Sequence, residues 1–286
     1  MKKTTFMLLV LSLLTLTACA SPIEFLKTGD PASCFDESDK LLTIRFLKTE
    51  TMSDCFYLTY DGMTMLIDCS TANEAQVNLV PHMRELGVEK IDCVVNTHPH
   101  NDHAEGFSSF AASFPIGALY TCFPLDCNQI QKQMVETAEA NDIPVIRLNN
   151  EDSIPFSDLS IQTYSDEEKE GCNCASMVIY IRFGNSKLML LADTEAIAQK
   201  RLNVLWNGDV KCDILKMPHH GNNTPSYSFM LNAQPRLAII TNRYTKQCAD
   251  AITSAHNVGC GDILFTFNAD IVCVTDGNRW VIHQEW

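Results

Sequence analysis

Short runs of apolar residues, separated by polar turns, recur along the chain from Leu41 onward. Runs of this length that are rich in β-branched and aromatic residues are typical of strands. Asp61-Gly62, between two such runs, predicts a tight hairpin turn. We therefore expect strands over residues 42–47, 55–60, 63–67, 91–96, 145–148, 159–164, 176–183, 187–191, 212–217, 237–241, 263–267, 271–275 and 280–283.

Longer segments between these strands predict helices. They cover residues 73–86, 126–141, 194–205, 225–232 and 249–256, and Gly87 is typical of a helix C-terminus. Both halves of the chain mix strands with helices. This favours an α+β or α/β sandwich, in which helices cover two sheets, over a helical bundle. No repeat and no interdomain linker interrupts residues 41–286, so we expect a single domain there.

The N-terminus has the features of an export signal. Lys2 and Lys3 precede an apolar stretch, residues 6–16, that is too short to span a bilayer. The following Leu-Thr-Ala-Cys, residues 16–19, resembles the lipobox of bacterial lipoproteins. That resemblance implies a signal peptide over residues 1–18, a lipid on Cys19 and an anchor at the extracellular face of the bacterial cell membrane. An ordinary secretory signal is the alternative. Residues 19–40 lack periodicity and are expected to form a tether.

The net charge of the chain disfavours one class of binding partner. The formal net charge is −14, and removal of the two lysines with the signal peptide would make it −16. Such a surface repels polyphosphate backbones, and no basic run interleaved with aromatic residues offsets it. Nucleic acid is therefore disfavoured as a partner.

The chain also contains 13 cysteines. Outside the cytosol disulfides are permitted, and Cys122 with Cys127 and Cys172 with Cys174 are the candidates near turns. Four of the others lie in expected strands, where cysteine acts as a small buried apolar residue. We expect core thiols at Cys55, Cys93, Cys212 and Cys273.

The first candidate for chemistry is the stretch His-Pro-His-Asn-Asp-His over residues 98–103, which directly follows the expected strand 91–96. It contains three imidazoles, His98, His100 and His103, and the carboxylate of Asp102. Imidazole nitrogens and carboxylate oxygens suit zinc and its first-row neighbours. Loops at strand ends are where chemistry is usually located. The spacing therefore predicts a metal site.

Two further strand ends present ligand-type residues. Asp193 follows the strand 187–191, and His219-His220 follow the strand 212–217. A helix N-cap is the alternative role of Asp193, and a solvated turn that of the histidine pair. Together with the first cluster, these residues are enough for two divalent ions bridged by one carboxylate. Zinc is the expected metal, with manganese or iron as alternatives.

These motifs together resemble those of metallo-β-lactamase-fold hydrolases, and most closely the extracellular hydrolase domain of the competence protein ComEC and related lipoproteins and secreted enzymes. The resemblance covers about residues 41–283. It is carried by Leu-Ile-Asp-Cys at 66–69, Thr97 to His103, Asn-Cys-Ala-Ser-Met-Val-Ile at 173–179, Leu-Leu-Ala-Asp at 190–193, and Leu-Lys-Met-Pro-His-His-Gly-Asn at 215–222.

The resemblance implies an αββα sandwich with two metals at one edge. His98 and His100 would hold the first metal, and Asp193 would bridge. Asp102 and His103 would hold the second metal with one histidine of the 219–220 pair. We assign His219 to that role and expect His220 to donate a proton, with Asp102 and His220 as the catalytic residues, but the sequence leaves open which of the two histidines is the ligand. Asp68 would support the metal loop from behind.

The chain departs from the family pattern in three places. Ala104-Glu105-Gly106 replaces a Gly-Gly pair, and Asn222 replaces a serine. Many relatives also place a third histidine on the first metal, but no histidine lies between His103 and Asp193. Asn173 is a candidate substitute. We therefore expect the first metal to bind more weakly than the second.

The expected activity is hydrolysis of a small-molecule or cell-envelope phosphodiester by a metal-bound hydroxide. A lactonase or β-lactamase-type hydrolase of carboxylic derivatives is the first alternative, although such enzymes would be expected to retain the third histidine. A metal-dependent binding lipoprotein without turnover is the second alternative. The substrate, the metal and the oligomeric state are not specified by the sequence.

Overall fold

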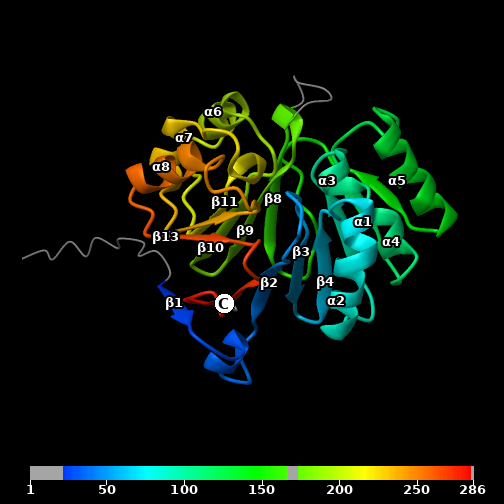
Figure 1. Cartoon of the computed structure of the whole chain (residues 1–286), viewed down its shortest axis with the longest axis horizontal. Helices are drawn as coiled ribbons and strands as arrows, with labels where there is room; N and C mark the ends of the chain where they lie inside the picture. The colour runs from blue at the N-terminus through cyan, green and yellow to red at the C-terminus, as the bar shows by residue number, and fades with distance from the viewer. Residues whose placement is uncertain (1–21, 167–172, 285–286) are drawn as a thin grey trace, which may run out of the picture.

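The structure is a computed structural model that describes residues 22–166 and 173–284. Two sheets face each other, and helices cover the outer face of each, as Figure 1 shows. The αββα sandwich expected from the sequence is confirmed. The expected lipid site, Cys19, lies outside the described residues.

The first sheet has nine strands. Their order in space is β1 (Ile23–Leu26), β15 (Trp280–Gln284), β14 (Ile271–Thr275), β2 (Leu42–Phe46), β3 (Phe56–Tyr60), β4 (Met63–Ile67), β5 (Cys93–Asn96), β6 (Leu119–Thr121) and β7 (Val145–Arg147). The strands β4 to β7 are parallel, so their carboxyl ends lie at one edge of the sheet.

The second sheet has six strands. Their order is β13 (Asp262–Phe265), β12 (Leu237–Ile240), β11 (Ile214–Lys216), β10 (Ser186–Leu190), β9 (Val178–Phe183) and β8 (Ser160–Tyr164). The strands β10 to β13 are parallel. Their carboxyl ends therefore deliver the segments that follow β10 and β11 to the same edge.

Helices pack on the outer faces. The first sheet is covered by a helix that begins as α1 (Ala72–Glu74), widens to a π-helix (Ala75–Leu79) and ends as α2 (Val80–Glu85), and by α4 (Phe107–Ala111) and α5 (Gln129–Ala140). The second sheet is covered by α6 (Ala196–Leu205), α7 (Tyr227–Ala233) and α8 (Ala249–Asn257). A short helix, α3 (Asn101–Ala104), contains part of the first motif. Short 3-10 turns occur at Pro31–Cys34, Asn173–Ala175 and Pro218–Gly221.

Three apolar clusters hold these layers together. The central cluster joins the two sheets and includes Ile44, Leu58, Ile179 and Leu188. The other two lie between each sheet and its helices. The alternation of buried and half-buried residues in β2 and β3 matches a strand with one face in the core.

The expected tether over residues 19–40 differs from the structure. Residues 23–26 form β1, which pairs in parallel with β15, and the backbone N–H of Trp280 donates to the carbonyl of Pro22 at 2.7 Å. The packed structure therefore begins before residue 41. The strand β1 is partly exposed, which explains why its apolar pattern is weak in the sequence.

The core thiols expected from the sequence are confirmed. All four are buried and free: Cys55, Cys93, Cys212 and Cys273. Of the candidates near turns, Cys122 and Cys127 are free thiols, and Cys174 is buried. Cys172 lies outside the described residues.

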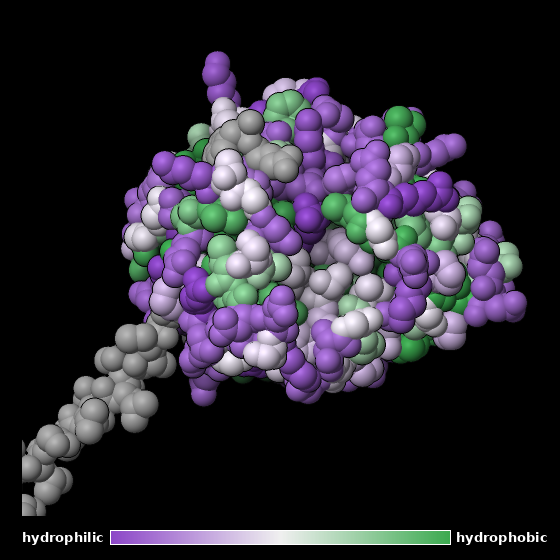
Figure 2. Space-filling view, turned by 90° about the horizontal axis from the view of Figure 1, so that it is seen from below, coloured by the Kyte–Doolittle hydropathy of each residue, from purple (hydrophilic) through white to green (hydrophobic). Residues whose placement is uncertain are grey.

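Polar and charged residues cover most of the face seen in Figure 2, and apolar residues lie between them in separate small groups. Among the helices of the described part of the chain, none has both the length and the apolar character that crossing a membrane requires.

Candidate metal centre

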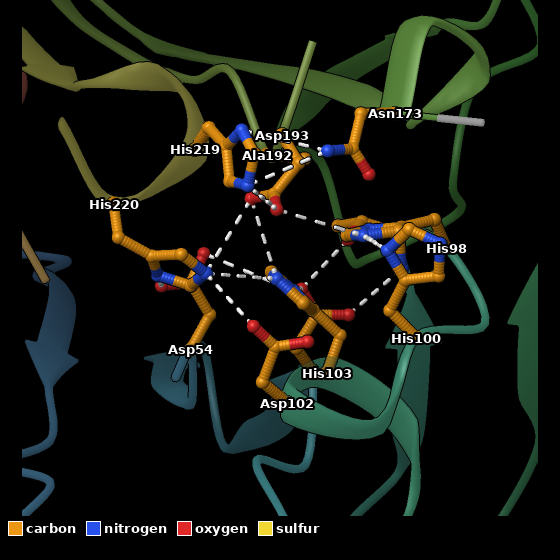
Figure 3. A network of polar contacts seen from close by, with 12 residues as sticks. Asp54, His98, His100, Asp102, His103, Asn173, Ala192, Asp193, His219 and His220 are labelled. Atoms are coloured by element: carbon orange, nitrogen blue, oxygen red, sulfur yellow. Dashed lines mark hydrogen bonds and ion pairs between the residues drawn. The ribbon is translucent and has the colours of Figure 1, made fainter. Parts of the chain in front are cut away.

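Three strand ends meet at one edge of the sandwich. His98 follows β5, Asp193 follows β10, and His219-His220 follow β11. The backbone joins these segments, because the N–H of Met177 donates to Thr97 O at 2.9 Å and the N–H of His219 donates to Ala192 O at 2.9 Å. The candidate residues therefore come together although they lie in both sheets, as Figure 3 shows.

The turn of helix over Asn101–Ala104 sets the direction of Asp102 and His103. It is held against the loop after β4, because Cys69 N–H donates to His103 O at 2.7 Å. Gly106 is required in this arrangement, since a Cβ there would lie 1.9 Å from Cys69 O. The departure from a Gly-Gly pair thus leaves a glycine where the backbones approach most closely.

One group of side chains surrounds a single oxygen of Asp193. His103 Nε2 lies 3.3 Å and His220 Nε2 3.7 Å from Asp193 Oδ1. The two Nε2 atoms are 3.3 Å apart, and His220 Nε2 is 3.2 Å from Asp102 Oδ2. His103, Asp193 and His220 are fully buried. We call Asp102, His103, Asp193 and His220 the inner group.

The other ring nitrogen, Nδ1, of both His103 and His220 also has a partner. His103 Nδ1 lies 2.7 Å from Asp68 Oδ2. His220 Nδ1 lies 2.9 Å from Thr241 Oγ1 and 3.1 Å from Asp54 Oδ1. In the neutral ring, a carboxylate at Nδ1 places the ring proton there and leaves the Nε2 lone pair free to bind a metal.

Asp54 is a buried carboxylate that the sequence analysis did not identify. Its second oxygen forms an ion pair with the ammonium of Lys216, and both side chains are fully buried. Lys216 Nζ also donates to Ala192 O at 3.1 Å. Lys216 therefore links Asp54, behind His220, to the loop that carries Asp193.

A second group lies on the other side of Asp193. His98 Nε2 is 3.7 Å and His219 Nε2 is 3.6 Å from Asp193 Oδ2. His98 Nε2 is 3.1 Å from His100 Nδ1. His98 is buried, whereas His100 and His219 are partly exposed. We call His98, His100, Asp193 and His219 the outer group.

Asp68 stands behind both groups. It accepts from Thr97 N at 2.8 Å and from Thr97 Oγ1 at 2.7 Å, and this hydroxyl lies 3.2 Å from His98 Nδ1. Its backbone is left-handed, with φ of 58°. Asp68 therefore contacts His103 directly and His98 through Thr97.

Burial and neighbouring charges shift the pKa values of the histidines in different directions. Burial, followed by repulsion from His103, holds the pKa of His98 well below its usual value. Burial also lowers the pKa of His220, but Asp193 and Asp54 outweigh it and raise that pKa to about 9. In the same way, burial would raise the pKa of Asp54, but Lys216 and then His220 hold it well below its usual range.

The inner group fits a divalent ion. Asp193 Oδ1 is buried and has no hydrogen-bond partner among the described residues. Two imidazole Nε2 atoms face each other beside it, which requires a shared proton or a shared cation between them. Ligand atoms of Asp54, His103, Asp193 and His220 all lie within 4.8 Å of one another. Asp54 contacts the Nδ1 side of His220, so its position matches that of a supporting residue.

The structure thus places every candidate metal-binding, catalytic and supporting residue at this edge, but it separates the adjacent histidines. His220, expected to donate a proton, lies beside Asp102 and His103. His219, expected beside those residues, lies in the outer group. Asn173 Nδ2 is 3.4 Å from His219 Nδ1.

Asp54 and Lys216 were missed for different reasons. Lys216 lies in an apolar strand, and a buried lysine is a sequence signal for a charged partner. Asp54 lies in a short polar segment before β3, where no local pattern marks it.

Comparison with known proteins agrees with this geometry. The model of the metallo-beta-lactamase superfamily matches residues 48–236. The chain is 25% identical over 181 residues to competence protein ComA of Neisseria gonorrhoeae, covering 63% of this chain and 24% of that protein. It is 24% identical over 174 residues to ComE operon protein 3 of Bacillus subtilis, covering 58% and 22%. The chain therefore spans about a quarter or less of these relatives.

Solved structures share the fold. The metallo-beta-lactamase fold protein YhfI from Bacillus subtilis has a TM-score of 0.60 at 11% identity, covering 82% of this chain and all of that one. CmlA, a diiron β-hydroxylase from Streptomyces venezuelae, has a TM-score of 0.59 at 12% identity, covering 84% and 55%. At these identities the likeness shows the fold alone.

Proposed function

The chain belongs to the metallo-beta-lactamase superfamily, and on that premise we propose that it is a metal-dependent hydrolase of phosphodiesters, anchored at the extracellular face of a bacterial cell membrane. The observation that carries the proposal is the inner group around Asp193, in which His103, Asp193 and His220 are buried. A cluster of imidazoles and carboxylates, with an oxygen that lacks a hydrogen bond, is expensive to bury without a cation.

Asp102, His103, Asp193 and His220 would hold one ion, and His98, His100 and the second oxygen of Asp193 would take part in holding another. A divalent ion supplies Lewis acidity at such a site, because it polarises a phosphoryl oxygen and acidifies water. We propose zinc, with manganese or iron as alternatives, because imidazole and carboxylate ligands suit all three.

The protein prepares the ligand atoms before any ion binds. Asp68 and Asp54 hold the Nδ1 sides of His103 and His220, so each ring is fixed in orientation with Nε2 toward the cluster. Burial keeps His98 in its neutral form, which is the form that binds metals. Because His220 is fully buried with Nε2 inside the inner group, we propose it as a ligand in place of the proton donor expected from the sequence.

Two features support a phosphodiester over a carboxylic substrate. The motifs resemble those of the ComEC branch, and no histidine lies between His103 and Asp193, where lactonases and β-lactamases would be expected to have one. The negative charge of −14 disfavours nucleic acid, so we propose a small or cell-envelope phosphodiester.

Turnover tests this function. The purified chain with added zinc or manganese should hydrolyse bis(p-nitrophenyl) phosphate, and His103→Ala should lower kcat/KM by at least about 100-fold. His256→Ala, on α8, is the matched control and should retain activity. Hydrolysis of a chromogenic β-lactam or a lactone, without phosphodiester turnover, would overturn the substrate class. Metal binding without any turnover would favour the binding lipoprotein.

Membrane attachment is tested separately. If Cys19 carries a diacylglyceryl group, the wild-type chain should partition into the detergent phase, because two acyl chains give firm attachment. Cys19→Ala should partition into the aqueous phase. Equal release of both forms into the medium would contradict the anchor.

A further inference from the structure

We infer that His219 completes the first metal site through Nε2 and that Asn173 orients its ring; this inference rests on the proposed metal-dependent function. It replaces the expectation that the first site lacks a fourth protein ligand. It also assigns the two adjacent histidines to different ions, His219 to the outer group and His220 to the inner group.

Asp193 divides the histidines between its two oxygens. His103 and His220 approach Oδ1 at 3.3 and 3.7 Å. His98 and His219 approach Oδ2 at 3.7 and 3.6 Å. In Figure 3 the ring of His219 lies beside Asp193, whereas the ring of His220 faces Asp102 and His103. A carboxylate that bridges two ions presents one oxygen to each, so the histidines sort into two sets.

The spacings in the inner group fit tetrahedral coordination, and three spacings in the outer group are similar. Bonds of about 2.0–2.1 Å to zinc give a tetrahedron whose edges are about 3.4 Å. In the inner group the measured edges are 3.2, 3.3, 3.3 and 3.7 Å. In the outer group they are 3.1 Å from His98 to His100, 3.7 Å from His98 to Asp193 and 3.6 Å from His219 to Asp193. His219 therefore approaches the bridging oxygen at the same spacing as His98 does.

The backbone explains how neighbours in sequence reach opposite sides. His219 has φ of 48° and ψ of 50°, and His220 has φ of 53° and ψ of 21°. Both lie in the left-handed region, which is costly for residues with a Cβ and is found mainly at functional sites. The hydrogen bond from His219 N to Ala192 O fixes this turn against the Asp193 loop. As a result the two ring centroids lie 6.1 Å apart with planes inclined at 60°.

Asn173 has an unsatisfied atom that this assignment explains. Its Oδ1 is buried without a hydrogen-bond partner among the described residues, while its Nδ2 lies 3.4 Å from His219 Nδ1 and 3.5 Å from His219 Nε2. If Nε2 of His219 binds a metal, Nδ1 carries the proton and must donate it. Exchanging the amide oxygen and nitrogen of Asn173, which differ little in shape, gives Oδ1 this donor. Asn173 then acts as a positioning residue and not as the ligand.

Metal stoichiometry of the full-length chain tests the assignment without any use of activity. The wild type, titrated with Co²⁺ or Zn²⁺ alone, should bind about two equivalents. In His219→Ala one equivalent should remain tight and the other should weaken by more than about 100-fold, beyond the 10–100-fold typical of a lost supporting contact. Asn173→Ala should weaken the same equivalent by about 10–100-fold, and Asn173→Asp, which keeps an acceptor, should restore it. His256→Ala is the control.

A thiolate at each position identifies the ligand directly. With Co²⁺, His219→Cys should give the near-ultraviolet charge-transfer band of a cobalt–thiolate bond, and Asn173→Cys should not. The reverse pattern, or two tight equivalents in His219→Ala, would overturn the assignment. If the wild type binds two equivalents and His219→Ala binds one, but neither hydrolyses a phosphodiester, the proposed function fails and the assignment stands.

Discussion

At the scale of single residues, the centre depends on charges that have no contact with solvent. Lys216 and Asp54 form an ion pair in which both side chains are fully buried. The pair is close to Asp193, since Lys216 Nζ is 3.9 Å from Asp193 Oδ1. Removal of one buried partner leaves the other charge without compensation, which is usually more harmful than removal of both.

Lys216→Met should therefore lower the free energy of unfolding by about 3–5 kcal/mol in the presence of chelator. The double variant Asp54→Asn/Lys216→Met should recover part of this loss, because no isolated charge stays buried. Urea denaturation measures both. Lys40→Met, which removes an exposed ion pair to Asp61, is the control and should leave the free energy of unfolding nearly unchanged. Equal losses in Lys40→Met and Lys216→Met would contradict the argument.

At the scale of elements, two hairpin turns join the sheets at a distance from the metal centre. Gly184, between β9 and β10, touches Gly277, between β14 and β15: a Cβ on Gly184 would lie 2.6 Å from Gly277 O. The N–H of Asn185 donates to the same carbonyl at 2.6 Å. Both glycines have positive φ, at 56° and 89°. This contact therefore has no space for a side chain.

Gly184→Ala should destabilise the fold through two effects, backbone strain and a clash with backbone atoms. Gly62→Ala is a matched control, because Gly62 also has a positive φ, 74°, but a Cβ there meets nothing within 4 Å. We expect Gly184→Ala to cost about 1–3 kcal/mol more than Gly62→Ala, the usual range for overpacking. Thermal or urea unfolding of the two variants measures this difference. Indistinguishable stabilities would show that the turns can separate freely.

A second link between elements depends on pH. His82 on α2 lies 2.7 Å from Asp270, which precedes β14 and also contacts Arg45 and the N–H of Lys48. This hydrogen bond raises the pKa of His82 and, against burial, lowers that of Asp270. The contribution of His82 is thus fully present below its unfolded pKa of about 6.5 and is lost as the pH rises through the higher folded value. The contribution of Asp270 to stability is lost only when the pH falls through its lowered folded pKa.

The stability difference between the wild type and His82→Asn should therefore shrink as the pH rises from about 6 to about 9. Urea unfolding at a series of pH values measures it. Asp270→Asn should show the same loss of pH dependence in this range. A constant difference across the series would exclude a role for protonated His82 in joining α2 to the first sheet.

At the scale of the whole molecule, the metal centre closes one edge of both sheets, so metal binding and folding should be linked. An ion that binds only the folded state at a free concentration of about 100 times its Kd adds about 2.7 kcal/mol to the free energy of unfolding. We expect zinc to raise the Tm and a chelator to reverse the effect. His103→Ala should show a smaller rise. A Tm that is independent of zinc in the wild type would contradict this linkage.

Much of this architecture could be predicted from the chain. The ranges 63–67 and 271–275 coincide with β4 and β14, since each is an apolar run that is largely buried. The helix expected over 73–86 corresponds to residues 72–85, although it contains a π-helical stretch next to Pro81. The histidine motif predicted the metal site because its residues are close together in the sequence and follow a buried strand.

What was missed depends on contacts between distant residues. The strands β1 and β6 are four and three residues long, too short for a reliable pattern, and are defined by pairing with β15 and β5. Asp54 owes its role to Lys216 and His220, which lie far along the chain. The different surroundings of His219 and His220 follow from a left-handed turn that residue type does not indicate.

The order of strands in the first sheet has a consequence for the time course of folding. The last hairpin, β14 and β15, lies between β1 and β2, which come first in the sequence. Until translation has nearly finished, β1 has no neighbour and β2 can pair only with β3, and pairing over such separations is slow. Nascent chains stalled before Ile271 should therefore remain sensitive to protease, while released chains become resistant. During synthesis, the open edge of β2, which later pairs with β14, would be the edge most in need of protection from other chains.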